Sequence, residues 1–271
     1  MSLFILGVFL VLMFLGIPVA VSLGMASLGA ILMYDTSTIA SAVKLMYSSM
    51  NSFTMVAVPL FFLAGILMDK GGVAEQIFSF CEDVVGWIHG GLGHVNIMTS
   101  ILFAGMSGSS VADVASIGAL CANAMIRSGY PSPYAWGTTL ASSMLPSVIP
   151  PSILMVVAAS VAQVSMGQAL FAGIIPGVFL GLVMMVYNYF YCKKHGIGHR
   201  IPFNGGRLWK SFKRALPALM VPVILLGGMY TGYFTSTEAA AICVLYTLIV
   251  SMLSIYSFCL LALRPDLSLN T

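Results

Sequence analysis

Long stretches of this chain contain no Asp, Glu, Lys or Arg, and this constrains the fold more than any other feature. They include Met1–Tyr34, Ser128–Cys192, Ala215–Thr237 and Ala239–Leu263. A helix that crosses the hydrocarbon core of a bilayer needs about 20 mostly apolar residues, so each stretch can hold at least one crossing. Charged residues make up 7% of the chain, against about 25% in a soluble domain. The sequence therefore predicts an all-α polytopic membrane protein and excludes a water-soluble domain.

The apolar runs predict where helices cross the membrane. The expected spans are 2–33, 55–68, 168–192, 215–234 and 238–263. The first of them lacks the basic start of a secretory signal, so we expect a retained helix that kinks at Gly16, Pro18 and Gly24. The semi-polar stretch 35–53 between the first two spans is expected to lie at the interface or to pack against other helices.

Residues 73–94 have a different pattern. Apolar residues recur at helical spacing, the acids take other positions, and Trp87 follows near the end. This pattern predicts an amphipathic helix in the plane of the membrane surface. A helix that binds a partner protein is the alternative.

Seven of the eleven Lys and Arg residues lie between Lys193 and Arg214, without an intervening acid. Such a run can bind nucleic acid or anionic lipid, but the positive-inside rule explains it more simply. We therefore expect a cytoplasmic loop that contacts membrane lipid, and no nucleic-acid partner.

Two segments are interrupted where a membrane helix would be continuous. Val95–Phe103 and Val111–Met125 are short apolar pieces joined by the glycine and serine residues of 105–110. They predict a helical hairpin that enters and leaves on one side of the membrane. Residues 134–164 contain three prolines within six positions, and proline removes a helical hydrogen bond, so this segment predicts one discontinuous helix.

Broken helices at membrane depth expose carbonyl and hydroxyl oxygens, and they mark binding sites in secondary transporters. Oxygen ligands suit Na⁺ rather than a transition metal. The candidate residues for Na⁺ and substrate are Ser107, Gly108, Ser109, Ser110, Ser142, Ser143, Pro146, Pro150 and Pro151. The alternative is that the small residues only allow helices to pack closely.

Two acids are assigned supporting roles. Asp113 follows the serine turn, where it can cap the next helix or stabilise the hairpin, or else assist the cation. Glu238 opens the last span and is expected to cap it. The five cysteines are scattered in apolar surroundings and predict buried thiols, without a disulfide or metal site. The histidines and serines form no catalytic motif, so no enzymatic activity and no cofactor other than Na⁺ as the coupling ion is expected.

Three motifs carry a resemblance to a known family. They are Gly105–Asp113 (GMSGSSVAD), Ser142–Ser152 (SSMLPSVIPPS) and Thr235–Ala241 (TSTEAAA). Together they resemble the large membrane subunit of tripartite ATP-independent periplasmic (TRAP) transporters, over about residues 1–250. A weaker likeness lies in Pro59–Gly65.

The resemblance implies a Na⁺-coupled importer of organic anions, such as dicarboxylates or sialic acid, in the bacterial inner membrane. It implies an elevator motion, a small membrane subunit and a periplasmic binding protein that delivers the substrate. The fold would be an elevator-type transporter half with a re-entrant hairpin and a discontinuous helix. The expected parts are scaffold helices (1–72), an arm helix (73–94), a transport domain (95–164), two helices joined by the basic loop (165–234) and the start of a second repeat (235–271).

Two departures from the family pattern accompany the resemblance. Ser236 stands where the family usually has proline. Family members are much longer because they contain two inverted repeats, so we expect this chain to be truncated and to lack the second sodium site. Two alternatives remain: a symporter similar to the divalent-anion/Na⁺ family, and a membrane scaffold fragment without transport activity.

Overall fold

The computed structural model describes residues 1–34, 38–51, 53–198 and 201–262, and all regular elements in these ranges are helical. The predicted all-α fold is therefore confirmed for the described part of the chain. The chain divides into two compact units, Met1–Ser52 and Phe53–Thr271.

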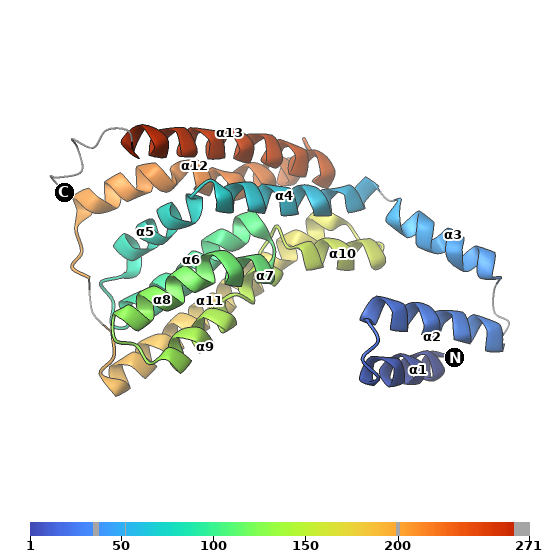
Figure 1. Cartoon of the computed structure of the whole chain (residues 1–271). Helices are drawn as coiled ribbons and strands as arrows, with labels where there is room; N and C mark the ends of the chain where they lie inside the picture. The colour runs from blue at the N-terminus through green and yellow to red at the C-terminus, as the bar shows by residue number, and fades with distance from the viewer. Residues whose placement is uncertain (35–37, 52, 199–200, 263–271) are drawn as a thin grey trace. The chain divides into compact units, whose positions relative to one another are not determined.

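The first unit contains a helical hairpin instead of the predicted single span over 2–33. Helices α1 (Ser2–Phe14) and α2 (Val19–Tyr34) lie side by side (Figure 1). The rings of Phe4 and Tyr34 meet at 5.8 Å, so the start of α1 contacts the end of α2. The chain reverses because Gly16 adopts a left-handed conformation with φ of 82° and Pro18 cannot donate a helical hydrogen bond. Helix α3 (Ile39–Met50) follows, within the stretch predicted to lie at an interface or to pack.

The second unit begins with a short 3₁₀ turn and continues through ten helices and two short irregular helical turns. In chain order these are η1 (Phe53–Val56), α4 (Ala57–Lys70), α5 (Val73–Val85), α6 (Gly91–Ser107), α7 (Ser110–Asp113), the π-turn η2 (Val114–Gly118), α8 (Ala119–Arg127), α9 (Ser132–Ser142), the 3₁₀ turn η3 (Leu145–Ser147), α10 (Ile153–Val161), α11 (Met166–His195), α12 (Gly205–Tyr230) and α13 (Ser236–Ala262).

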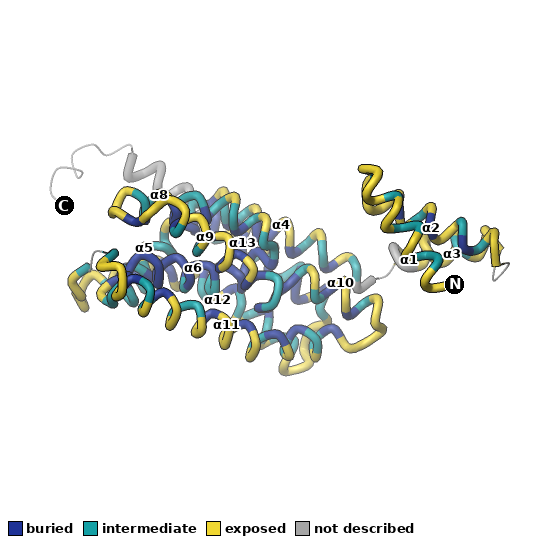
Figure 2. The backbone as a smooth tube through the Cα atoms, turned by 90° about the horizontal axis from the view of Figure 1, so that it is seen from below, coloured by how far each residue is buried: buried dark blue, intermediate teal, exposed yellow. Residues whose placement is uncertain are grey.

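Helix α6 lies at the centre of this unit and is buried along most of its length (Figure 2). It packs against α4, α5, α8, α9 and α11. The helix starts at Gly91, earlier than the predicted start at Val95. With α7, η2 and α8 it forms the predicted helical hairpin, whose arms are joined at Gly108 and Ser109. Its relation to a membrane stays a prediction.

The predicted discontinuous helix is also present. Helix α9 ends at Ser142, η3 makes one short turn, and α10 resumes at Ile153. Pro150 and Pro151 lie in the gap and are joined by a cis peptide bond. The break therefore falls where the prolines predict it.

The amphipathic helix is shorter than predicted and more deeply packed. Helix α5 ends at Val85, and His94, which was expected to belong to it, is a buried residue of α6. Ile77 and Cys81 are fully buried because α5 packs against α6 and α12. Its place in the plane of the membrane surface stays a prediction.

Helices α11 and α12 are each long and apolar enough to cross a membrane, and the bent pair α4 and α5, which meet at 73°, can count as a third crossing. Helix α13 extends over 27 residues, and its side chains are described and apolar over Ser236–Met252. The basic run is mostly helical: Lys193 and Lys194 end α11, whereas Arg207 to Arg214 lie on α12. Helical residues therefore extend into both ends of the predicted loop, and Arg200 lies outside the described residues.

Three glycines set the close approach of α11 to the hairpin and the break. Gly173, Gly177 and Gly181 are buried and recur at every fourth position. A Cβ at Gly173 would lie 2.7 Å from Met155, and one at Gly181 would come into contact with Ile101. Small residues at this spacing allow membrane helices to approach closely.

Arg207 on α12 forms an ion pair with Asp83 on α5. The Asp83 side chain is 3% exposed and that of Arg207 48% exposed, and the second carboxylate oxygen of Asp83 has no recorded hydrogen bond. The pair therefore joins α5, which lies in the predicted arm helix, to the start of α12, which lies in the predicted basic loop.

We expect Arg207→Gln to lower the free energy of unfolding by about 1–3 kcal/mol, because it leaves a buried carboxylate without its charged partner. The cost should be below that of a fully buried pair because Arg207 is half exposed. Thermal unfolding of the purified chain would measure it, with Glu75→Gln on the exposed face of α5 as control. The double change with Asp83→Asn should recover part of the loss; an unaltered loss would contradict this role for the pair.

Candidate functional site

The tip of the hairpin touches the break in the discontinuous helix. The backbone N–H of Ile153, the first residue of α10, donates to the carbonyl oxygen of Gly108 at 3.1 Å. Gly108 ends α6 in a left-handed conformation with φ of 59°, and a Cβ there would collide with the carbonyl oxygen of Pro151. Glycine is thus required both for its backbone angle and for the contact. The two interruptions predicted from the sequence form one structural site.

The serines of the hairpin tip have three different roles. Ser110 shares a short hydrogen bond with Ser147 of the break. Ser109 caps the next helix, because its hydroxyl accepts from the N–H of Ala112 at 3.3 Å. Ser107 is buried and its hydroxyl oxygen has no recorded partner. A Cβ on Gly65 of α4 would lie 3.0 Å from the Ser107 Cα, so α4 covers this side of the tip.

Asp113 is fully buried and links the two arms of the hairpin. Ser100 of α6 donates to its Oδ2 at 3.0 Å. Ser143 lies close enough to interact with this carboxylate, although not in hydrogen-bonding geometry. The second carboxylate oxygen, Oδ1, has no recorded partner. This bond is consistent with the predicted role of Asp113 in the hairpin, which stays a prediction, and the side-chain cap of the next helix is Ser109.

The break itself is closed by local hydrogen bonds. Ser152 caps α10 by accepting from the N–H of Met155 at 3.2 Å, and it donates to the carbonyl oxygen of Ser147 at 2.6 Å. Ser142 donates to the carbonyl oxygen of Thr139 at 3.0 Å. The prolines Pro146, Pro150 and Pro151 are all buried. The candidate residues of the break therefore lie inside the protein.

Glu238 lies at the start of α13 rather than in the hairpin or the break. Its carboxylate accepts from the backbone N–H and the hydroxyl of Thr235, each at 2.8 Å, and Thr235 accepts in return from the Glu238 N–H. This reciprocal pattern is a capping box at the start of α13. The predicted capping role is confirmed, and no recorded bond joins Glu238 to the hairpin or the break.

Sequence reasoning missed three polar residues that extend the site. Asn96 of α6 donates to the hydroxyl of Thr139 on α9 at 2.7 Å, and Ser100 lies 3.2 Å from the hydroxyl of Ser142. Asn96, Ser100 and Ser107 face the same side of α6 at helical spacing. That spacing within an apolar helix was the available signal, since polar side chains buried among membrane helices usually bond across them.

The predictions for the cysteines and for metal sites concern here only the residues whose side chains are described. Cys81, Cys121, Cys192 and Cys243 are buried with free thiols, while Cys259 lies outside the residues whose side chains are described. Within the described part of the chain, no cluster of three or more His, Cys, Asp or Glu could hold a metal ion.

The arrangement offers oxygen ligands in a buried setting. Hydroxyl oxygens of Ser107 and Ser143 and one oxygen of Asp113 are buried and have no recorded hydrogen bond. Buried polar atoms usually have a hydrogen-bond partner, a bound water or an ion, and Ser143 and Asp113 also lie close enough to interact with each other. The chemistry of this donor set suits a small hard cation.

Comparison with known proteins gives a consistent family. The family model of the tripartite ATP-independent periplasmic transporter DctM component matches residues 6–263. The sialic acid TRAP transporter large permease protein SiaM of Vibrio cholerae is 41% identical over 237 residues, which are 88% of this chain and 56% of that protein. The C4-dicarboxylate TRAP transporter large permease protein DctM of Pseudomonas aeruginosa is 38% identical over 85% of this chain and 54% of that protein.

A third relative is the sialic acid TRAP transporter permease protein SiaT of Haemophilus influenzae, 38% identical over 90% of this chain and 39% of that protein. The chain thus spans about half the length of the large permease proteins it matches. These matches favour the TRAP family over the divalent-anion symporters considered from the sequence. With its hairpin and broken helix, the chain belongs to the DctM component family of tripartite ATP-independent periplasmic transporters.

Proposed function

We propose that this chain forms the Na⁺-coupling half of a TRAP large permease that imports an organic anion. The observation that carries the proposal is the contact between Gly108 at the hairpin tip and Ile153 at the break. The same hairpin and break also contain buried oxygens without a hydrogen bond, those of Ser107, Asp113 and Ser143. Unwound backbone of this kind, set between membrane helices, is where secondary transporters bind substrate and coupling ions.

Sodium is proposed as the coupling ion because of the donor set. The hydroxyl and carboxylate oxygens at the hairpin are hard ligands, which suit Na⁺ better than a transition metal. A cation bound beside Asp113 would also neutralise a carboxylate that is fully buried, and a buried charge needs such a partner. Asp113 would then serve both the hairpin and the ion.

An organic anion is proposed as the substrate for two reasons. The N-terminus of α10, capped by Ser152, begins at the break, and helix N-termini favour negative charge. Relatives of this chain are named for sialic acid, C4-dicarboxylate and isethionate. All three of these substrates are anions.

The remaining parts of the proposal follow from the family. A small membrane subunit and a periplasmic substrate-binding protein would complete the system in the bacterial inner membrane, and α6 to α10 would move as an elevator against the scaffold helices. A membrane scaffold without transport activity is the competing function. It predicts stable assembly without any response to Na⁺.

We expect Na⁺ to raise the thermal unfolding midpoint of the purified chain, whereas K⁺ and choline at equal ionic strength should not. A ligand that binds only the folded state at 100 times its Kd adds about 2.7 kcal/mol of stability. Asp113→Asn should abolish the shift because it removes the carboxylate charge beside the hairpin tip. Glu238→Gln should retain it, since glutamine also completes a capping box. A shift that survives in Asp113→Asn, or no shift in the unaltered chain, would contradict the sodium proposal.

Transport requires a full-length relative, reconstituted in vesicles with its partners. With the serines equivalent to Ser107 and Ser110 changed to alanine, the Na⁺ concentration for half-maximal uptake should rise about tenfold, equivalent to about 1.4 kcal/mol. The control is the serine equivalent to Ser116, whose hydroxyl donates to the carbonyl oxygen of Ala112 within its own helix. Unchanged sodium dependence in both test variants would remove these hydroxyls from the ion site.

A further inference from the structure

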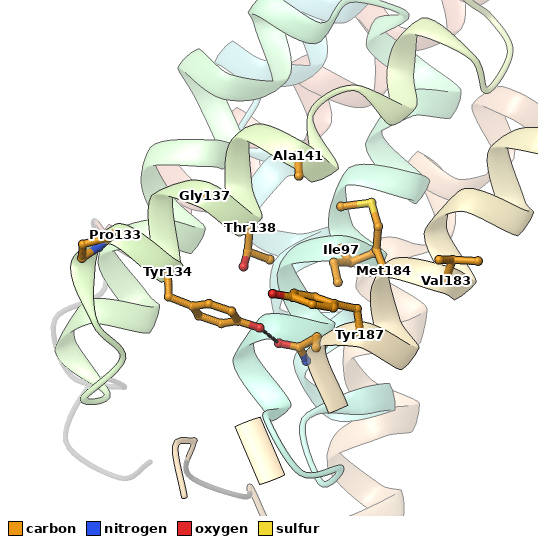
Figure 3. A pocket seen from close by; sticks show the side chains of 10 residues that line it. Ile97, Pro133, Tyr134, Gly137, Thr138, Ala141, Val183, Met184 and Tyr187 are labelled. Carbon is orange, nitrogen blue, oxygen red and sulfur yellow. Dashed lines mark hydrogen bonds between the residues drawn. The ribbon is translucent and has the colours of Figure 1, made fainter. Parts of the chain in front are cut away.

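We propose that the groove between α9 and α11 binds one anionic phospholipid, with an acyl chain in the groove and the headgroup at Lys194. The groove has a volume of about 480 Å³ and is lined chiefly by Ile97 of α6, Tyr134, Gly137 and Ala141 of α9, and Met184 and Tyr187 of α11 (Figure 3). Pockets of about 300–1,000 Å³ commonly hold small ligands. This site is separate from the proposed transport site.

The walls of the groove suit a hydrocarbon chain. Ile97, Ala141 and Met184 are apolar, and the hydroxyl of Tyr134 is engaged because it donates to Asn188 at 2.8 Å (Figure 3). Thr138 and Tyr187 supply the other side-chain hydroxyls of a lining that is otherwise mostly apolar (Figure 3). Ser142 and Ser143, which follow Ala141, are buried at the break.

Gly137 leaves space for the chain in the middle of the groove. A Cβ built on it would meet no heavy atom within 4 Å. A larger side chain at this position would therefore project into the groove without colliding with the protein. This property makes Gly137 a direct means of filling the site.

The groove leads to a positively charged end of α11. Lys194 follows Tyr187 by seven residues, so both lie on the same face of the helix, about 10 Å apart along its axis. His195 stacks on Tyr191 at 4.3 Å, and Tyr191 stacks on Tyr134 at 4.2 Å. Lys194 and His195 are exposed. Neither α9 nor α11 contains an acid, and no ion pair of Lys194 is recorded among the described residues.

This combination favours a phospholipid over other occupants. An inorganic phosphate would use only the lysine, and a helix from another polypeptide would need no cation at the end of the groove. A lipid with an anionic headgroup uses both the groove and the lysine, since its acyl chain fills the apolar groove and its phosphate contacts Lys194. Tyrosines between chain and headgroup are typical of the membrane–water interface.

The test uses the whole chain, purified and placed in nanodiscs that contain equal amounts of phosphatidylglycerol and phosphatidylcholine. After extraction into mild detergent, native mass spectrometry counts the lipids that remain bound. We expect one retained lipid, with phosphatidylglycerol in at least fivefold excess. Retention without preference between the two lipids would overturn the proposal, as would displacement of the bound lipid by millimolar inorganic phosphate.

Paired variants test the headgroup contact separately from the acyl-chain contact. Lys194→Gln should reduce the preference for phosphatidylglycerol at least threefold, whereas Lys193→Gln should keep it, because Lys193 is directed to the ring of Tyr189. An equal loss in both would indicate diffuse surface charge and overturn the site.

The part of the site that would hold the acyl chain is tested by variants that fill the groove. Gly137→Leu, or Ala141→Phe as a second variant, should reduce retention of both lipids. Gly227→Leu is the matched control, since a Cβ on this α12 glycine also meets nothing within 4 Å. Unfolding midpoints of all variants confirm that they fold. Unchanged retention in folded Gly137→Leu and Ala141→Phe would overturn the proposal.

Discussion

The structure of this chain depends on how the hydrogen-bonding groups of the backbone find partners in the break between α9 and α10. In a lipid environment an unpaired N–H or carbonyl group costs several kcal/mol, so a break can persist only inside protein. The hairpin tip supplies the missing partner: the carbonyl oxygen of Gly108 accepts from Ile153, and Ser110 meets Ser147. The hairpin tip and the break thus supply hydrogen-bond partners to each other.

Close packing around this contact comes from small residues. Gly65 brings α4 to the tip at Ser107, and Gly177 brings α11 to Ile149 in the break. Lipid provides little hydrophobic drive for helices to associate, so these contacts and the cross-helix hydrogen bonds hold the unit together. The bond between Ser100 and Asp113 is central among them because it joins both arms of the hairpin.

The polar and apolar sides of α9 have separate roles in the two proposals. Thr139 and Ser142 face α6 and extend the oxygen-lined site, whereas Gly137 and Ala141 face the groove beside α11. One short helix thereby separates the proposed ion site from the proposed lipid site. A lipid held there would contact the same rigid element that ends at the break.

The sequence by itself determined the class of protein, the family and the positions of both breaks, because charge depletion, proline and glycine act locally. It also located the capping box of Glu238, whose partner is three residues away. Only the tertiary structure decided that the tip and the break touch, that residues 2–33 form two helices, and that Asp113 bonds to Ser100. These facts depend on contacts between distant segments, and helical periodicity along one segment carries no information about which partner it meets.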